Sequence, residues 1–141
     1  MTKHTISVLV ENRAGVLARI AGLFARRAFN IDSLAVGETE NPAFSRMTIV
    51  VDGDEHMVDQ VEKQLNKQLD VVKVRRLSSD DITRRELILV KVRALASKRG
   101  EIIDTARVMN AKVVDISLET LTIELCDRPE RIELLIEILR P

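Results

Sequence analysis

The sequence has no tryptophan, no tyrosine and only three phenylalanines among its 141 residues. A nucleic-acid platform that stacks bases on exposed rings needs aromatic side chains, so their scarcity argues against that class of protein. Lysine plus arginine and aspartate plus glutamate number 22 each. This balance leaves no overall basic field that would attract a phosphate backbone. The sequence therefore predicts neither a nucleic-acid partner nor an acidic or basic tail.

Cysteine is almost absent as well, because Cys126 is the only one. An intrachain disulfide or a cysteine-based zinc site is excluded, and a lone thiol fits a reducing cytosol. We expect Cys126 to be a small buried hydrophobe. The N-terminus carries only a five-residue apolar run before charge returns, which is too short for a signal peptide or a membrane span. The sequence predicts a cytoplasmic protein without a membrane partner.

The first half has the periodicity of a small α+β domain. Apolar residues make up 45% of the chain, so a core of aliphatic side chains is available. Alternating and β-branched runs predict strands over 5–10, 30–36, 45–52 and 71–77. Helical spacing begins at Val16, and a second helix follows Asp54, which is a good N-cap. The order β-α-β-β-α-β over residues 1–77 is the ferredoxin-like arrangement.

The pattern restarts after a polar segment, residues 78–85, which we interpret as a linker. Residues 86–141 predict a strand, a helix, two strands around a turn near Glu119, and a helix with Pro129 near its start. This second ferredoxin-like domain lacks its last strand. The strand at 87–92 would then present unpaired backbone groups. Either another chain covers that edge or the chain was cut short.

One loop stands out chemically. The sequence VENRAG joins the first strand to the first helix, and Gly15 lies where the helix begins. Unpaired first-turn N–H groups and the helix dipole attract a carboxylate or phosphate, and Asn12 offers both a donor and an acceptor. The alternative is purely structural: Asn12 caps the helix and Gly15 eases the turn. Residue chemistry alone favours the structural interpretation, because such loops are common.

The segment ISVLVENRAGVLARIAGLF resembles an ACT domain, a broad amino-acid-sensing module. The combination of RRAFNIDSLAVGETE with SRMTIVV is more specific, and resembles the small, regulatory subunit of acetohydroxyacid synthase (acetolactate synthase). The second half, from KVRA to ELLIEILRP, resembles the C-terminal domain of the same family. Nearly the whole chain is covered. Family members normally continue past LRP with another strand and a short tail, whereas this sequence stops at Pro141.

This resemblance implies a subunit with no catalytic residues, no metal site and no cofactor of its own. The family's large catalytic subunit carries thiamine diphosphate, magnesium and FAD, and condenses pyruvate with pyruvate or 2-ketobutyrate on the route to valine, leucine and isoleucine. The small subunit binds the large one, raises its activity and makes it sensitive to the end product, usually valine. The family's ACT domains pair side by side as a homodimer, and higher oligomers are possible.

The resemblance also implies an effector site between two chains. One chain contributes its loop and the partner contributes the start of the second strand. Backbone N–H groups of the loop would receive the effector carboxylate, and asparagine oxygens would accept from its ammonium group. The expected effector-binding residues are Asn12, Ala14, Gly15, Val16, Leu17, Asn30, Ile31 and Val36.

The residues are compatible with two other classes of protein. The chain could be a stand-alone ACT-type sensor or transcription regulator, although neutral charge and the lack of a DNA-reading segment argue against nucleic acid. An enzyme is disfavoured, because no nucleophile–base pair or metal constellation is visible. The sequence does not decide which branched-chain amino acid is sensed, since these differ by about a methylene, worth roughly 1–3 kcal/mol.

Overall fold

The computed structural model describes residues 2–77 and 82–140. The chain forms two compact units, residues 1–82 and 83–141. Part of the expected linker, residues 78–81, lies outside the described residues. Unit 1 contains β1 (Thr2–Glu11), α1 (Val16–Arg26), β2 (Ile31–Glu38), β3 (Phe44–Gly53), α2 (Glu55–Asn66) and β4 (Val71–Leu77). Unit 2 contains β5 (Glu86–Arg93), α3 (Ala96–Val108), β6 (Lys112–Ile116), β7 (Thr120–Asp127) and α4 (Pro129–Leu139).

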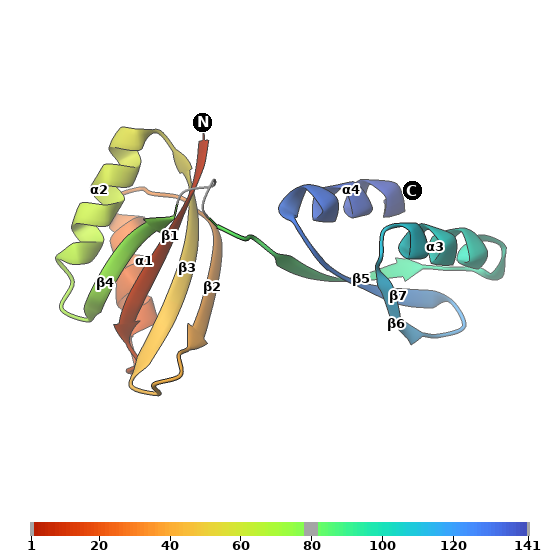
Figure 1. Ribbon diagram of the computed structural model, residues 1–141, viewed down its shortest axis with the longest axis horizontal. Coiled ribbons are helices and arrows are strands. Elements are labelled where there is room, and N and C mark those ends of the chain that lie inside the picture. Colours follow the sequence, from red (N-terminus) through yellow and green to blue (C-terminus); the bar gives the residue numbers. More distant parts are fainter. Residues whose placement is uncertain (1, 78–81, 141) are drawn as a thin grey trace. The chain divides into compact units, whose positions relative to one another are not determined.

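Unit 1 is a four-stranded antiparallel sheet in the order β2-β3-β1-β4. Both helices cover the same face of this sheet (Figure 1). Alternate residues of the central strands point toward the helices, because side chains on a strand alternate between faces. The core consists mainly of aliphatic side chains: Ile6, Val8, Val10, Val16, Ile20, Leu23, Phe24, Met47, Ile49, Val51, Val58, Val61 and Leu65. The predicted α+β ferredoxin-like arrangement is confirmed.

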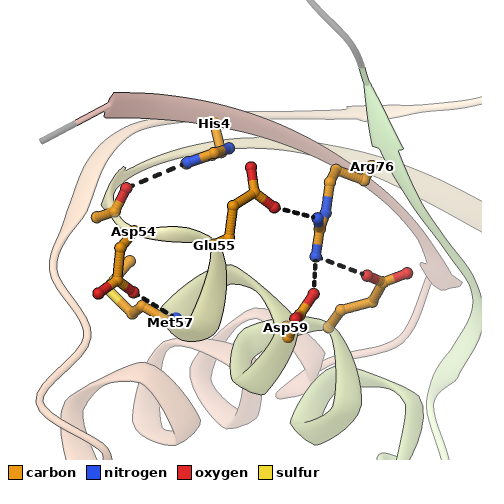
Figure 2. Close-up of polar contacts among 8 residues, drawn as sticks. His4, Asp54, Glu55, Met57, Asp59 and Arg76 are labelled. Atoms are coloured by element: carbon orange, nitrogen blue, oxygen red, sulfur yellow. Dashed lines mark hydrogen bonds and ion pairs between the residues drawn. The ribbon is translucent and has the colours of Figure 1, made fainter.

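The start of α2 follows the predicted capping chemistry. The Asp54 carboxylate accepts a hydrogen bond of 2.8 Å from the backbone N–H of Met57 (Figure 2). Such a cap satisfies one of the first-turn donors and is worth about 1 kcal/mol. On the same helix, Glu55, Asp59 and Glu62 all form ion pairs with Arg76 of β4 (Figure 2). These contacts hold the edge strand β4 against α2.

Unit 2 has a three-stranded antiparallel sheet in the order β5-β7-β6, with α3 and α4. Its core contains Ala106, Met109, Ile123, Leu125, Ile132 and Leu135. Pro129 begins α4, as predicted. Among the described residues β5 pairs only with β7, in line with the predicted unit that lacks a closing strand.

The prediction that Cys126 is buried is wrong, because its thiol is exposed. Leu121, Ile123 and Leu125 of β7 take the buried side. The two-residue period of a strand therefore places Cys126 on the opposite face. No helix in the described part of the chain is long and apolar enough to cross a membrane.

Candidate effector-binding loop

The loop between β1 and α1 turns on Gly15. This residue is the N-cap of α1 and has φ +88°, in the left-handed region that glycine adopts without strain. A Cβ atom placed there would lie 3.1 Å from Nη1 of Arg19. No side chain within residues 2–77 or 82–140 caps the helix. Among the described residues the N–H groups of Ala14 and Gly15 donate to no protein acceptor, so both are available to a ligand.

Asn12 does not cap α1, so that part of the structural interpretation is wrong. Its side-chain amide donates to the carbonyl of Pro42 at 2.9 Å and to Oε2 of Glu38 at 3.4 Å. Its backbone N–H donates to the carbonyl of Ala43 at 2.8 Å. Asn12 is thus fixed to the β2–β3 connection, which lies beside the loop because β1 and β3 pair along their whole length. Its Oδ1 accepts no hydrogen bond from the described residues and is free to accept one from a ligand.

A carboxylate from a distant part of the chain braces both sides of the loop. Oδ1 of Asp70 accepts a hydrogen bond of 2.5 Å from Nη2 of Arg13, and Oδ2 accepts one of 2.7 Å from Nε of Arg19. The Asp70 side chain is only 11% exposed, and Arg13 also pairs with Glu11. The hydrogen bond from Arg19, together with that from Arg13, holds the pKa of Asp70 below its ordinary value of 3.8. The loop and the first turn of α1 are therefore held in one position.

The ion pairs of Asp70 with Arg13 and Arg19 predict a contribution to stability that is lost in acid. Because the pKa of Asp70 is lowered by folding, its stabilisation is fully present above about pH 4 and is lost as the pH falls through the lowered pKa. We expect Asp70→Asn to lower the free energy of unfolding near neutral pH, and the gap to wild type to close below pH 4. Urea unfolding of both proteins across this pH range measures the difference in their free energies of unfolding. Asp104→Asn, at an exposed position of α3, is the control and should leave stability unchanged. A gap that persists unchanged into acid would contradict the role of the charge.

The predicted site residues fall into two groups. Asn12, Ala14, Gly15 and Leu17 are exposed on or beside the loop. Val16 is different, because its side chain is buried in the core and its N–H already donates to the carbonyl of Arg13 at 3.3 Å. The Val16 side chain therefore cannot line a surface site, although its backbone shapes the loop.

The second group lies on β2, and one chain alone does not complete the site. Val36 is exposed near the loop end of β2, whereas Asn30 and Ile31 lie at its other end. The seven steps from Ile31 to Glu38 span about 23 Å of extended strand. Asn30 and Ile31 are thus remote from Asn12 within one chain. The sequence did not predict that Arg13, Arg19 and Asp70 hold the loop in place. The charged residues on both sides of Gly15 were the only local indication of such ion pairs.

The fold and this loop define a class: a ferredoxin-like βαββαβ module with a glycine at the first strand-to-helix turn, which is the ACT type of domain. Residues 6–73 match a family model described as AHAS small subunit-like ACT domain. Residues 85–141 match a second model, described as the small subunit of acetolactate synthase. The two matches fall on the two units of the structure.

Proteins that are similar to this chain over nearly its whole length carry the same description as the second family model. The acetolactate synthase small subunit of Mycolicibacterium smegmatis is 52% identical over 98% of this chain and 81% of that protein. A probable acetolactate synthase small subunit of Archaeoglobus fulgidus is 49% identical over 98% of this chain and 86% of its own length. The crystal structure of the acetolactate synthase small subunit from Thermotoga maritima superimposes with a TM-score of 0.91 at 39% identity, covering 99% of this chain and 87% of that one.

The chain belongs to the acetolactate synthase small subunits, which are regulatory, non-catalytic subunits containing an ACT domain. The family resemblance read from the sequence is confirmed. A small subunit implies a catalytic subunit as its partner. Among the described residues no group of three or more histidine, cysteine, aspartate or glutamate side chains could hold a metal ion.

Proposed function

We propose that this chain binds valine between two ACT domains, raises the activity of the catalytic subunit of acetolactate synthase, and transmits feedback inhibition to it. In this proposal thiamine diphosphate, magnesium and FAD belong to the catalytic subunit. The small subunit contributes no reacting group. Its part is to bind an amino acid and to change the state of its partner, with a coupling free energy of about 1–3 kcal/mol between the two events.

The observation that carries the proposal is the position of β2. This strand is an edge of the sheet, and seven of its eight residues are exposed. An edge strand can pair with its symmetry mate in an antiparallel, two-fold manner. Pairing about the middle of β2 would bring the partner's Ile31 to the end of the strand that carries Glu38, whose carboxylate lies 3.4 Å from the Asn12 amide. Two half-sites that are remote in one chain would then meet at the loop.

The chemistry available there matches a free amino acid. The N–H groups of Ala14 and Gly15 can donate to the carboxylate, and Oδ1 of Asn12 can accept from the ammonium group. Each hydrogen bond to a charged group supplies about 1.5–3 kcal/mol. A small branched side chain can rest on Leu17 and Val36, which are both 46% exposed, and on the partner's Ile31.

The β2 edge yields a prediction about oligomeric state. Leu34 and Val36 are large apolar side chains, 40% and 46% exposed, on the side of β2 that faces the helix layer. We expect Leu34→Lys combined with Val36→Lys to shift a dimer to monomers in sedimentation velocity, because pairing would bury unpaired charges. The control is Leu87→Lys combined with Leu89→Lys on β5, where the apolar residues are also exposed. Dissociation by the β5 pair but not by the β2 pair would place the interface elsewhere.

Calorimetric titration of valine into the full chain tests the effector. An isologous dimer has two equivalent loops, so we expect one valine bound per chain. Leucine and isoleucine should differ from valine by roughly 10- to 200-fold in affinity, the range that about one methylene can supply. Absence of binding by all three amino acids would contradict the proposed effector.

A further inference from the structure

The face of the unit 1 sheet that is opposite the helices is not covered by any described helix or strand of that unit (Figure 1). We call it the open sheet face. The strand register places three rows of cross-strand neighbours on it: Gly37, Arg46, Leu9 and Lys73; Ala35, Thr48, Ser7 and Arg75; Ser33, Val50, Thr5 and Leu77. Residues directly paired across an antiparallel sheet project from the same face. The face therefore combines small side chains with a group of long cations.

All three charged residues in these rows are positive. Arg46 and Lys73 lie on either side of Leu9, and Arg75 is two residues along β4 from Lys73. Neighbouring strands are about 4.8 Å apart and successive residues of a strand about 3.4 Å, so the backbones of the three cations lie within about 12 Å of one another. Arg46 donates to Oγ of Ser7 at 2.6 Å, whereas Lys73 and Arg75 contact no carboxylate among the described residues. Because the whole sequence has no net charge, the positive charge of this cluster is balanced by acidic residues elsewhere in the chain.

Glu11 and Asp52 flank the three rows at the two ends of the open sheet face, where they pair with Phe44 and Lys3. Three further acids of unit 1 lie on the other layer. Glu55, Asp59 and Glu62 extend along α2 and share the one guanidinium of Arg76 (Figure 2). They are on the helix side of the sheet, as Arg76 pairs with the inward-facing Ile6. They therefore cannot neutralise the open sheet face of the same unit. Two open sheet faces from two copies would repel each other, since like charges placed opposite one another destabilise a contact.

We propose that the open sheet face is a docking surface for a carboxylate-rich patch of the catalytic subunit. The inference rests on the family assignment, which supplies that partner, and adds which surface of the chain meets it. Small side chains such as Ser33, Ala35 and Thr48 let a second protein approach the sheet closely, while the flanking cations meet its carboxylates. Electrostatic complementarity of this kind speeds encounter and suppresses wrong partners, and its strength falls as salt rises.

The test uses two matched charge reversals in the full chain. One is Lys73→Glu with Arg75→Glu on the open sheet face. The other is Lys63→Glu with Lys67→Glu, at exposed positions on the helix layer, with the same change in net charge. We expect the sheet-face pair to bind the purified catalytic subunit at least about tenfold more weakly than wild type, and to show a flatter dependence of Kd on salt. The helix-layer pair should bind as wild type does.

A milder pair, Lys73→Gln with Arg75→Gln, guards against unfolding and should show a smaller loss of the same kind. Valine affinity should be unchanged in every variant, because the loop lies outside these rows. The inference is overturned if the sheet-face pair binds the catalytic subunit as wild type does, or if it changes only the oligomeric state of the chain. If the wild-type chain itself neither binds nor activates the catalytic subunit, the proposed function fails together with the docking surface. If the wild type binds and the sheet-face pair binds equally well, only the docking surface fails.

Discussion

Replacing Gly15 by aspartate is expected to abolish valine binding while leaving the chain folded. Two effects combine at this position. A Cβ atom would enter the space over the loop, 3.1 Å from Nη1 of Arg19, and a new carboxylate would stand where the effector carboxylate is expected. Left-handed backbone at a residue other than glycine costs about 1–3 kcal/mol. Calorimetric titration of valine, with urea unfolding in parallel, separates lost binding from lost stability.

Gly15→Asn is the matched control, because asparagine has nearly the same shape as aspartate and tolerates left-handed backbone. It carries no charge. We expect the asparagine variant to bind valine weakly and the aspartate variant not to bind it measurably. Equal loss in both variants would mean that space alone matters at the loop. Unchanged binding in the aspartate variant would mean that the loop is only a helix start and that the effector site lies elsewhere.

The second large effect concerns the core of unit 1. The Phe24 side chain is 2% exposed and meets Phe29 edge to face, with ring centroids 6.2 Å apart. Phe24→Ala is expected to lower the free energy of unfolding of unit 1 by about 3–5 kcal/mol, through lost burial and the cavity that remains. The substitution also removes the edge-to-face contact with Phe29.

Urea unfolding followed by the secondary-structure signal measures this loss. Leu69→Ala is the control, since Leu69 is 97% exposed and its truncation should change stability by no more than about 0.5 kcal/mol. The transition of unit 2 should not move in either variant, because Phe24 belongs to the core of unit 1. A loss below about 1 kcal/mol for Phe24→Ala would show that the packing is looser than described.

Local pattern was enough to predict most of the fold. The strand at 71–77 and the cap at Asp54 agree with the structure because alternation and capping depend on neighbouring residues. The first strand was predicted over 5–10, yet β1 runs from Thr2 to Glu11. Its ends are stabilised by pairing with β3, some 40 residues away, which no local pattern reveals.

The candidate site was less predictable, because its contacts are not local. Asp70 meets Arg13 across 57 positions of sequence, and Asn12 meets Pro42 across 30. The apolar residues of α1 include both Val16 and Leu17, yet Val16 is buried and Leu17 is exposed. Which of the two is buried depends on how the helix packs on the sheet. The exposed thiol of Cys126 likewise depends on which face of β7 is buried. The residues for the effector site, which came from family resemblance, stay a prediction.

The most direct test is the rate of acetolactate formation by the purified catalytic subunit, measured alone, with this chain, and with this chain plus valine. We expect a higher rate when the chain is added, and a fall on addition of valine that is absent for the catalytic subunit alone. The Gly15→Asp variant should still raise the rate but should make it insensitive to valine. An unchanged rate on adding the wild-type chain would contradict its role as the regulatory subunit of this enzyme.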